Sequence, residues 1–430
     1  MITIILLTIL FVSELVFSIW NLKTKKEHLK EKMYFRIIFT LFLLLGLLTG
    51  ILNDTSRYGM LLFLCTIQTA IAILKAYTKK ERPFKPLRQF FRPIGALLLW
   101  SMALLPAIIF PQYTEPKVTG THSVAVTQYT WTDEDRIETY TDTGENRSVT
   151  VKFWYPEEEG NYPLVIFSHG AFGVIDSNYS TFVELASNGY VVASIGHPYH
   201  AMMVEDANGN TTYMDMDFFN DVMTVDGSDT PEYNKTIYEK TQEWLSIRTG
   251  DMNFVLDTIL EKNKNGEAGP FSCVDPEKIG LFGHSLGGAT AVAVGRQRTD
   301  IDAVIDLEGT MFGEYVGFEN GLYLFNEEPY PIPLLDVNST AVYELESNNN
   351  QEYINFYVGE HAQEFHSVIF HNVGHLNFTD LPLVSPAIAG MLGTGDADAK
   401  ECIESLNEMV LNYFDYYLKD MVEWKVQEDY

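Results

Sequence analysis

Cysteine is scarce in this sequence, which has only three in 430 residues. Cys65 lies in an apolar run near the start, whereas Cys273 and Cys402 lie in the more polar remainder and could pair in an oxidising compartment. No cluster of cysteine and histidine has the spacing of a zinc site. We therefore expect no bound metal.

Basic residues are also scarce, and they are unevenly distributed. The chain has 29 Lys and Arg against 58 Asp and Glu. Residues 1–111 hold 14 basic and 5 acidic residues, a net charge of +9, so residues 112–430 hold the other 15 and 53, a net charge of −38. Because nucleic-acid binding neutralises phosphates with Lys and Arg, this balance excludes a nucleic-acid partner for the second part.

Long apolar runs are confined to the first quarter of the chain. There are four, and with flanking residues each is long enough to cross the hydrocarbon core of a bilayer. A cleaved signal peptide is not expected, because no basic segment precedes Ile2. We predict a membrane domain over residues 1–111 with four transmembrane helices, at about 2–20, 35–53, 59–76 and 94–111.

Glu14 is an unusual residue within the first of these spans. An intramembrane carboxylate is a candidate for a functional site. An interhelical hydrogen bond or a protonated acid explains it more simply, and we prefer that interpretation.

The Lys and Arg residues of the connecting loops predict the orientation. The second loop has only Arg57, whereas the first and third have six each. Because cytoplasmic loops are rich in these residues, loops one and three should be cytoplasmic and everything after Phe110 extracytoplasmic. We therefore expect a multi-pass protein of the cell membrane. The cationic residues are Lys23, Lys25, Lys26, Lys30, Lys32 and Arg36 in the first loop, and Lys79, Lys80, Arg82, Lys85, Arg88 and Arg92 in the third.

The pentapeptide Gly283–Gly287 is the most specific motif of the chain. It reads Gly-His-Ser-Leu-Gly, between a strand-like apolar run and a helical stretch of small residues. Strand, sharp turn and helix are the context of a nucleophile elbow, in which a strained turn presents a serine above the end of a sheet. We predict Ser285 as the nucleophile.

A serine hydroxyl needs a histidine as base, and the histidine needs a carboxylate to orient it. Both partners should follow the serine in the chain. His375 lies in a loop after the last strand-like run, and we predict it as the base. For the acid we prefer Asp306, which ends the strand-like run after the elbow helix, to Asp336 on the next strand and to Glu308. The other later histidines should face solvent or pair locally: His361, His366 and His371.

The oxyanion hole needs two backbone N–H groups. One should come from Leu286, directly after the nucleophile, and the other from Ala171, in the turn after the apolar run 163–168. His169 in that turn is expected to be structural, because it precedes the nucleophile.

Strand-like and helical segments alternate over residues 112–430. This order predicts an α/β fold of the α/β-hydrolase type, with a mostly parallel sheet and helices on both faces. The long acidic insertion 197–235 is either a lid beside the site or a solvated loop. The apolar segment 381–400 either lines an acyl pocket, touches the bilayer or packs as an ordinary loop.

These motifs resemble the secreted platelet-activating-factor acetylhydrolase family and, more distantly, dienelactone-hydrolase-type esterases. The matches run in order from Phe167–Gly170 through Gly283–Thr290 and Val304–Asp306 to His375–Asp380 and cover roughly residues 120–420. The resemblance implies an acid after the strand that follows the elbow helix, which favours Asp306, and esters with short or oxidised acyl groups as substrates. The sequence departs from the family at Leu307–Thr310, where the usual aromatic residue is missing, and in the insertion 197–235.

The expected function is therefore that of a membrane-anchored serine carboxylic-ester hydrolase that needs no cofactor. Its substrates would be short-acyl or phospholipid-type esters, as for a 1-alkyl-2-acetylglycerophosphocholine esterase. Two alternatives remain: an acyltransferase or peptidase with the same triad, and a non-catalytic membrane sensor or scaffold.

Overall fold

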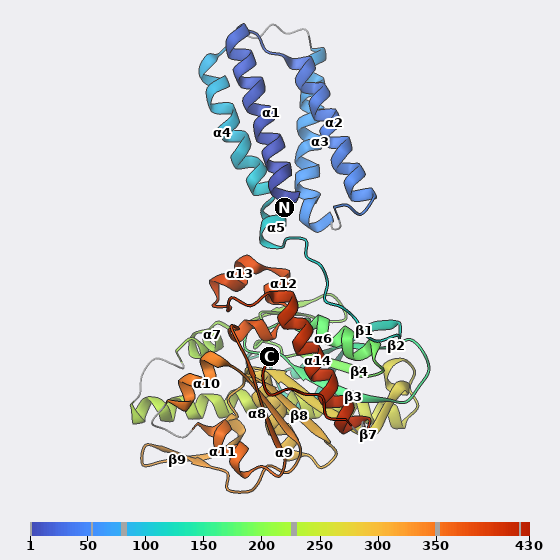
Figure 1. Cartoon of the computed structure of the whole chain (residues 1–430), viewed down its shortest axis with the longest axis vertical. Helices are drawn as coiled ribbons and strands as arrows, with labels where there is room; N and C mark the ends of the chain where they lie inside the picture. Colours follow the sequence, from blue (N-terminus) through green and yellow to red (C-terminus); the bar gives the residue numbers. More distant parts are fainter. Residues whose placement is uncertain (1, 53–54, 79–83, 225–229, 349–352, 421–422) are drawn as a thin grey trace. The chain divides into compact units, whose positions relative to one another are not determined.

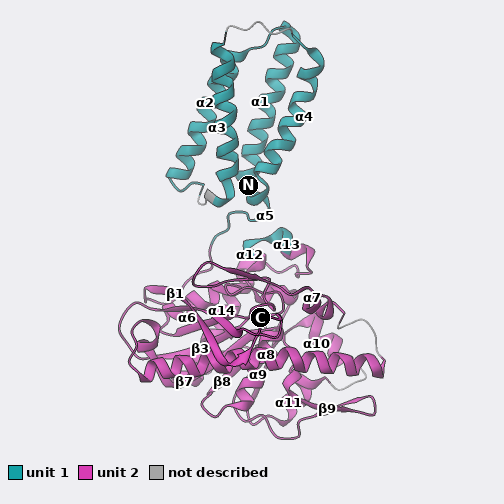
Figure 2. Ribbon diagram, turned by 180° about the vertical axis from the view of Figure 1, so that it is seen from behind, with its two compact units in different colours: residues 1–114, 383–388 teal, residues 115–382, 389–430 magenta. Residues whose placement is uncertain are grey.

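The computed structural model describes residues 2–52, 55–78, 84–224, 230–348, 353–420 and 423–430 (Figure 1). The chain divides into two compact units, coloured separately in Figure 2. The first holds residues 1–114 and 383–388, and the second holds residues 115–382 and 389–430. The boundary expected after residue 111 thus lies three residues later, and part of the apolar segment 381–400 belongs to the first unit.

The first unit is helical. Its apolar core includes Leu10 of α1, Leu43 of α2, Leu61 of α3 and Trp100 of α4. Among the described residues, two helices are long and apolar enough to cross a membrane, Ile2–Thr24 and Ser56–Tyr77. The helices are α1 (Ile2–Thr24), α2 (Leu29–Leu48), α3 (Thr55–Tyr77), α4 (Pro86–Ala103) and α5 (Leu105–Ile109).

Two helices begin before the spans expected from the apolar runs. Helix α2 begins about six residues before the expected segment 35–53, and α4 begins eight residues before the expected segment 94–111. Apolar runs mark the part of a helix that leaves water, whereas helix formation extends into flanking polar residues. Pro86 lies in the first turn of α4, where its missing N–H costs no hydrogen bond. Lys79, Lys80 and Arg82 of the third loop lie outside the described residues.

Glu14 is buried inside this unit and ion-paired. Its carboxylate accepts from Lys32, lies 3.1 Å from Arg36 Nη2 and lies 3.4 Å from Arg92 Nε. The residue therefore links α1 to α2 and α4, in agreement with an interhelical bond.

The second unit is built on an eight-stranded mixed sheet in the order β1-β2-β4-β3-β7-β8-β11-β12. Strand β2 pairs antiparallel with β1 and β4, and all other neighbours are parallel. The strands are β1 (Val124–Ile137), β2 (Asn146–Pro156), β3 (Tyr162–Ser168), β4 (Val191–Gly196), β7 (Val274–His284), β8 (Ala303–Leu307), β11 (Leu334–Ser339) and β12 (Phe365–Phe370).

Helices cover both faces of this sheet. Successive side chains of a strand point to opposite faces. On β3, Ile166 packs into the cluster that includes Met252 of α8, whereas Phe167 contacts Phe182 of α6 with ring centroids 5.0 Å apart. Phe414 of α14 packs on the same face as Phe182, where its ring contacts Phe282 of β7. The main helices are α6 (Tyr179–Ser187), α8 (Pro231–Lys264), α9 (Leu286–Gln297) and α14 (Ala399–Leu418).

Shorter elements decorate this framework. The insertion 197–235 holds a small hairpin and a helix before α8 begins. Cys273 and Cys402 are buried and unpaired, so the structure contains no disulfide between them. The remaining elements are β5 (Met203–Glu205), β6 (Thr211–Tyr213), α7 (Met216–Val222), β9 (Tyr315–Glu319), β10 (Leu322–Phe325), α10 (Thr340–Ser347), α11 (Ile354–His361), α12 (Leu381–Val384) and α13 (Pro386–Met391).

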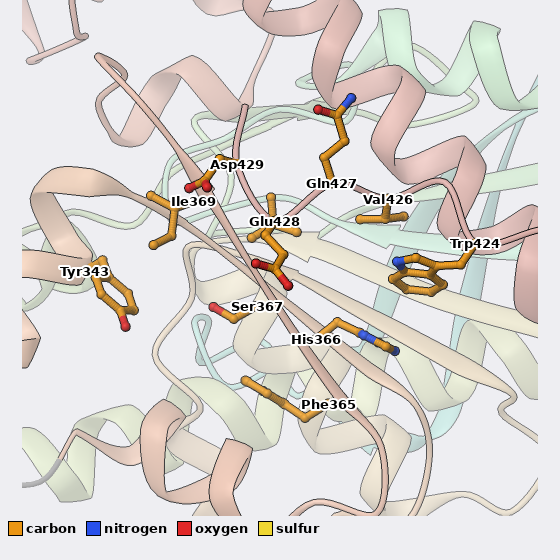
Figure 3. A pocket seen from close by; sticks show the side chains of 11 residues that line it. Tyr343, Phe365, His366, Ser367, Ile369, Trp424, Val426, Gln427, Glu428 and Asp429 are labelled. Carbon is orange, nitrogen blue, oxygen red and sulfur yellow. The ribbon is translucent and has the colours of Figure 1, made fainter.

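The C-terminal segment covers the edge of the sheet at β12. Ile369 N–H donates to Glu428 O at 2.9 Å, and Tyr430 N–H donates to Ile369 O at 3.0 Å. A cavity of about 550 Å³ lies between β12 and this segment, with His366, Trp424 and Asp429 among its lining residues (Figure 3). None of the predicted catalytic residues lines it.

Candidate active site

Ser285 occupies a strained turn between β7 and α9. Its φ and ψ angles are 56° and −126°, a conformation that residues with a side chain rarely adopt. A Cβ at Gly283 would lie 2.1 Å from Gly287 O, and one at Gly287 would lie 1.9 Å from Ser168 O, so both positions require glycine. Ser285 N–H donates to Leu307 O of β8 at 2.9 Å. The local geometry is that of a nucleophile elbow.

His375 lies in the turn after β12, and its carboxylate partner is Glu308. His375 Nδ1 donates to Glu308 Oε2 at 2.7 Å. Glu308 is buried and is itself held in place, since its other oxygen accepts from Ser339 N–H at 2.7 Å. The His375 side chain is 42% exposed, so its ring remains accessible while Glu308 is shielded from water. This pair has the geometry of a histidine base oriented by an acid.

His284 connects the histidine loop to the elbow. It directly precedes Ser285, and its Nε2 donates to His375 O at 3.0 Å. The rings of His284 and His375 have centroids 4.5 Å apart. Burial, together with the neighbouring His375, holds the pKa of His284 well below its usual value, so this imidazole stays neutral. The contact places the loop of His375 beside Ser285.

Asp306, which we preferred from the sequence as the partner of His375, does not bond to it in the described structure, where the partner is Glu308. Asp306 is fully buried in β8, where its Oδ1 accepts from Gly309 N–H at 2.9 Å. Burial, and then the nearby Asp336, raise the pKa of Asp306 well above its usual value, which favours a protonated acid that stabilises a cation poorly. The chain leaves the strand only at Glu308, whose φ of 55° turns it out of the sheet toward His375.

Asp336, the second alternative, is also directed elsewhere. Its carboxylate accepts from Asn338 Nδ2 at 2.7 Å and from Asn355 Nδ2 at 3.0 Å. Burial raises its pKa as well. Asp336 is therefore part of a polar cluster below the elbow and does not bond to His375 in the described structure.

The turn after β3 lies against the elbow, as expected for an oxyanion loop. A Cβ on Gly170 would lie 3.1 Å from Ser285 Cβ. Ala171 and Leu286 contribute to one apolar cluster with Phe218 and Trp244. The two residues predicted to supply N–H groups are thus brought together beside the serine.

His169 is buried within the same turn. Its Nδ1 donates to Gly170 O at 2.7 Å, and burial together with Arg248 lowers its pKa well below the usual value. The neutral ring of His169 stabilises the turn through this hydrogen bond, which agrees with the structural role expected for this residue.

The insertion 197–235 reaches this site through α7. Phe218 is buried and stacks on His200 with a centroid distance of 4.0 Å and an interplanar angle of 2°. It also contacts Trp244 edge-on at 5.3 Å. The insertion is therefore more than a solvated surface loop, because one of its helices forms a wall of the apolar cluster at Leu286.

A buried network of charged residues beside the turn after β3 could not be read from the sequence motifs. Arg147 donates to Asp251 at 2.6 and 2.8 Å, and His197 bridges Asp251 at 2.9 Å to Ser168 Oγ at 2.8 Å. Arg248 completes the network beside the loop. A signal existed, since Arg248 falls at helical spacing between the apolar Trp244 and Met252, where a solvent-facing arginine is not expected.

The three other histidines that follow Ser285 have partners away from the elbow. His361 pairs locally with Tyr357 O, whereas His366 bonds to Tyr417 of α14 and His371 to Thr340 of α10. Within the described ranges, no group of three or more His, Cys, Asp or Glu side chains could hold a metal ion.

The mixed sheet, the elbow after β7 and the histidine after β12 define an α/β hydrolase. A family model described as "Platelet-activating factor acetylhydrolase, isoform II" matches residues 139–429, and the chain belongs to this family.

Curated relatives agree with this assignment. The chain is 26% identical over 304 residues to a platelet-activating factor acetylhydrolase of Cavia porcellus, covering 64% of this chain and 63% of the relative. It is 27% identical over 291 residues to the Bos taurus protein of the same name, covering 61% and 59%. The chain thus spans about three fifths of the length of these relatives. Among solved structures, a ferulic acid esterase from Streptomyces cinnamoneus is similar, with a TM-score of 0.55, 21% identity, and coverage of 71% of this chain and 93% of that one, which supports the fold.

Proposed function

We propose that this protein is a membrane-anchored serine esterase that hydrolyses carboxylic esters through an acyl-enzyme. The observation that carries the proposal is the 2.7 Å bond from His375 Nδ1 to the buried Glu308, beside a serine in a strained elbow. A neutral imidazole with Nδ1 protonated leaves its Nε2 lone pair free to accept a proton. Family membership adds independent support for ester hydrolysis.

In the proposed mechanism Ser285 Oγ attacks the ester carbonyl while His375 Nε2 takes its proton. Glu308 stabilises the imidazolium that forms. The N–H groups of Leu286 and Ala171 hold the negative charge on the carbonyl oxygen. His375 then returns the proton to the leaving alcohol, and water hydrolyses the acyl-enzyme by the same steps in reverse order.

The apolar cluster at Leu286 favours a short acyl group as substrate. Phe218 and Trp244 are both buried beside this residue, so the space available to an acyl chain is limited by two large rings. The relatives named as platelet-activating factor acetylhydrolases suggest phospholipids with a short acyl group. We propose such esters as the substrate class.

The membrane anchor is proposed as four spans with the catalytic unit outside the cytoplasm. Apolar side chains are exposed on all four long helices, for example Ile4, Leu41, Phe63 and Leu98. A surface of this kind needs an apolar environment such as a bilayer. The cationic residues in the connections between α1 and α2 and between α3 and α4, and in the adjoining turns of these helices, then favour a cytoplasmic location for both connections.

The test is labelling with a fluorophosphonate together with hydrolysis of p-nitrophenyl esters of increasing chain length. The full chain in detergent or liposomes should be labelled and should hydrolyse acetate and butyrate faster than longer esters. Ser285→Ala should abolish labelling and turnover, while Ser272→Ala, at an exposed serine, should change neither. Labelling that persists in Ser285→Ala would place the nucleophile elsewhere. Efficient acyl transfer to an added alcohol in place of water would indicate the acyltransferase.

A further inference from the structure

Arg248 is a fully buried arginine that bonds to the back of the oxyanion loop. Its Nη1 donates to His169 O, and its Nη2 donates to Gly170 O at 3.2 Å. Its Nε donates to His200 Nδ1 at 3.1 Å. One guanidinium therefore binds two successive carbonyl groups of the turn that precedes Ala171.

Gly170 O also accepts from His169 Nδ1 at 2.7 Å and from Gly173 N–H at 3.1 Å, and together with these contacts the two Arg248 bonds fix which way the following N–H groups point. In a trans peptide the C=O of one residue and the N–H of the next point in opposite directions. Because Gly170 C=O is directed at Arg248, the N–H of Ala171 is directed away from it. Ser285 Cβ lies against the same turn, 3.1 Å from where a Cβ of Gly170 would be.

We propose that Arg248 is a positioning residue of the oxyanion hole, holding the Gly170–Ala171 peptide so that Ala171 N–H faces the ester carbonyl at Ser285. This inference rests on the proposed function. Bonds from a charged donor are roughly twice as strong as neutral ones, so they hold the peptide firmly. They also polarise it, which strengthens the bond that its N–H can donate.

His200 extends the positioning to the neighbouring residue. With Nδ1 accepting from Arg248, its Nε2 carries the proton and donates to Tyr140 Oη at 2.7 Å. Its backbone carbonyl accepts from Phe172 N–H at 2.9 Å, and Phe172 has a φ of 61°. The loop is thus fixed on both sides of Ala171 by Arg248 and by a residue that Arg248 contacts.

The inference is tested with Arg248→Met and a matched control, Arg147→Met. Arg147 is also buried and belongs to the same network, but it bonds to Asp251 and Glu138 and not to the oxyanion loop. Arg136 Nη2 lies 3.0 Å from Asp251 Oδ1, so Asp251 should keep a cationic partner in Arg147→Met. We measure kcat and KM for a short p-nitrophenyl ester and the temperature of thermal unfolding. We also measure the inhibition constant of an alkyl boronic acid, because its tetrahedral adduct with the serine carries an oxyanion.

We expect Arg248→Met to lower kcat by about 10²–10³, the loss typical of one oxyanion donor, with little change in KM. The boronic acid should lose affinity in parallel. Arg147→Met should lower the unfolding temperature but keep kcat within about tenfold of the unchanged protein. If Arg248 had a purely structural role, both substitutions would change kcat and the unfolding temperature to a similar extent.

The proposal is overturned if folded Arg248→Met keeps its kcat, or if kcat falls no further than in Arg147→Met. Where Arg248→Met does not fold, Arg248→Lys decides, since lysine keeps the charge but cannot bond both carbonyls in a fixed geometry. An intermediate kcat with unchanged KM supports the proposal, and an unchanged kcat overturns it. If the unchanged protein is not labelled by the fluorophosphonate and does not hydrolyse esters, the proposed function is wrong, and this inference is wrong with it.

Discussion

The identity of the acid is a question at the scale of single residues. We expect Glu308→Gln to lower kcat by about 10⁴, because the amide can no longer stabilise the imidazolium of His375. Asp306→Asn should lower kcat by less than about tenfold, since the raised pKa of Asp306 makes a neutral amide a close substitute for the protonated acid. Steady-state kinetics of the two variants decide between them, and a larger loss in Asp306→Asn would reverse the assignment.

The same residues mark the limit of what the sequence predicts. Ser285 and His375 could be proposed from the sequence because their motifs are local, a strained turn between strand and helix and a loop after the last strand. Choosing between Asp306 and Glu308 requires knowing where β8 ends and how φ changes there, which is a matter of one or two residues. Arg248 could not be assigned to the oxyanion loop, because its partners lie about 80 residues away in the chain.

At the scale of elements, α7 is expected to control the length of the acyl group. Phe218→Ala removes the ring beside Leu286 and Trp244, so kcat/KM for octanoate relative to acetate should rise. The loss of a buried ring should also destabilise the fold by about 3 kcal/mol or more. Met216→Ala on the exposed side of the same helix is the control and should leave the ratio unchanged. The measurement is a chain-length series of p-nitrophenyl esters, and an unaltered ratio in Phe218→Ala would separate α7 from the acyl site.

Elements were predicted well where the period of apolar residues was clear. The alternation of strands and helices predicted a mostly parallel sheet with helices on both faces, and in the structure only β2 pairs antiparallel with its neighbours. Helices α2 and α4 begin before the expected spans because charged and proline-containing turns continue a helix beyond its apolar part. The sequence could not decide whether the insertion 197–235 lies beside the site. Its helix α7 is short, and its buried contact with the site is made by one side chain, Phe218.

At the scale of the whole molecule, the orientation can be tested with protease on intact spheroplasts. The Lys and Arg residues that precede α4 predict cleavage of the catalytic unit from outside. Residues 84–92 should stay protected until the cells are lysed. Cleavage of the catalytic unit only after lysis would reverse the orientation, although the esterase chemistry would be unaffected.

The three cysteines, all buried and unpaired, make this chain convenient for site-directed labelling. A maleimide that cannot enter the folded protein should react with almost no thiol of the unchanged chain, which therefore serves as the negative control. A single cysteine introduced at the exposed Asn208 or at the exposed Lys26 would then carry the only reactive thiol, one in each unit. The side of the membrane on which each position lies could be read directly from which of the two is modified by an impermeant reagent, with no need to remove native thiols first.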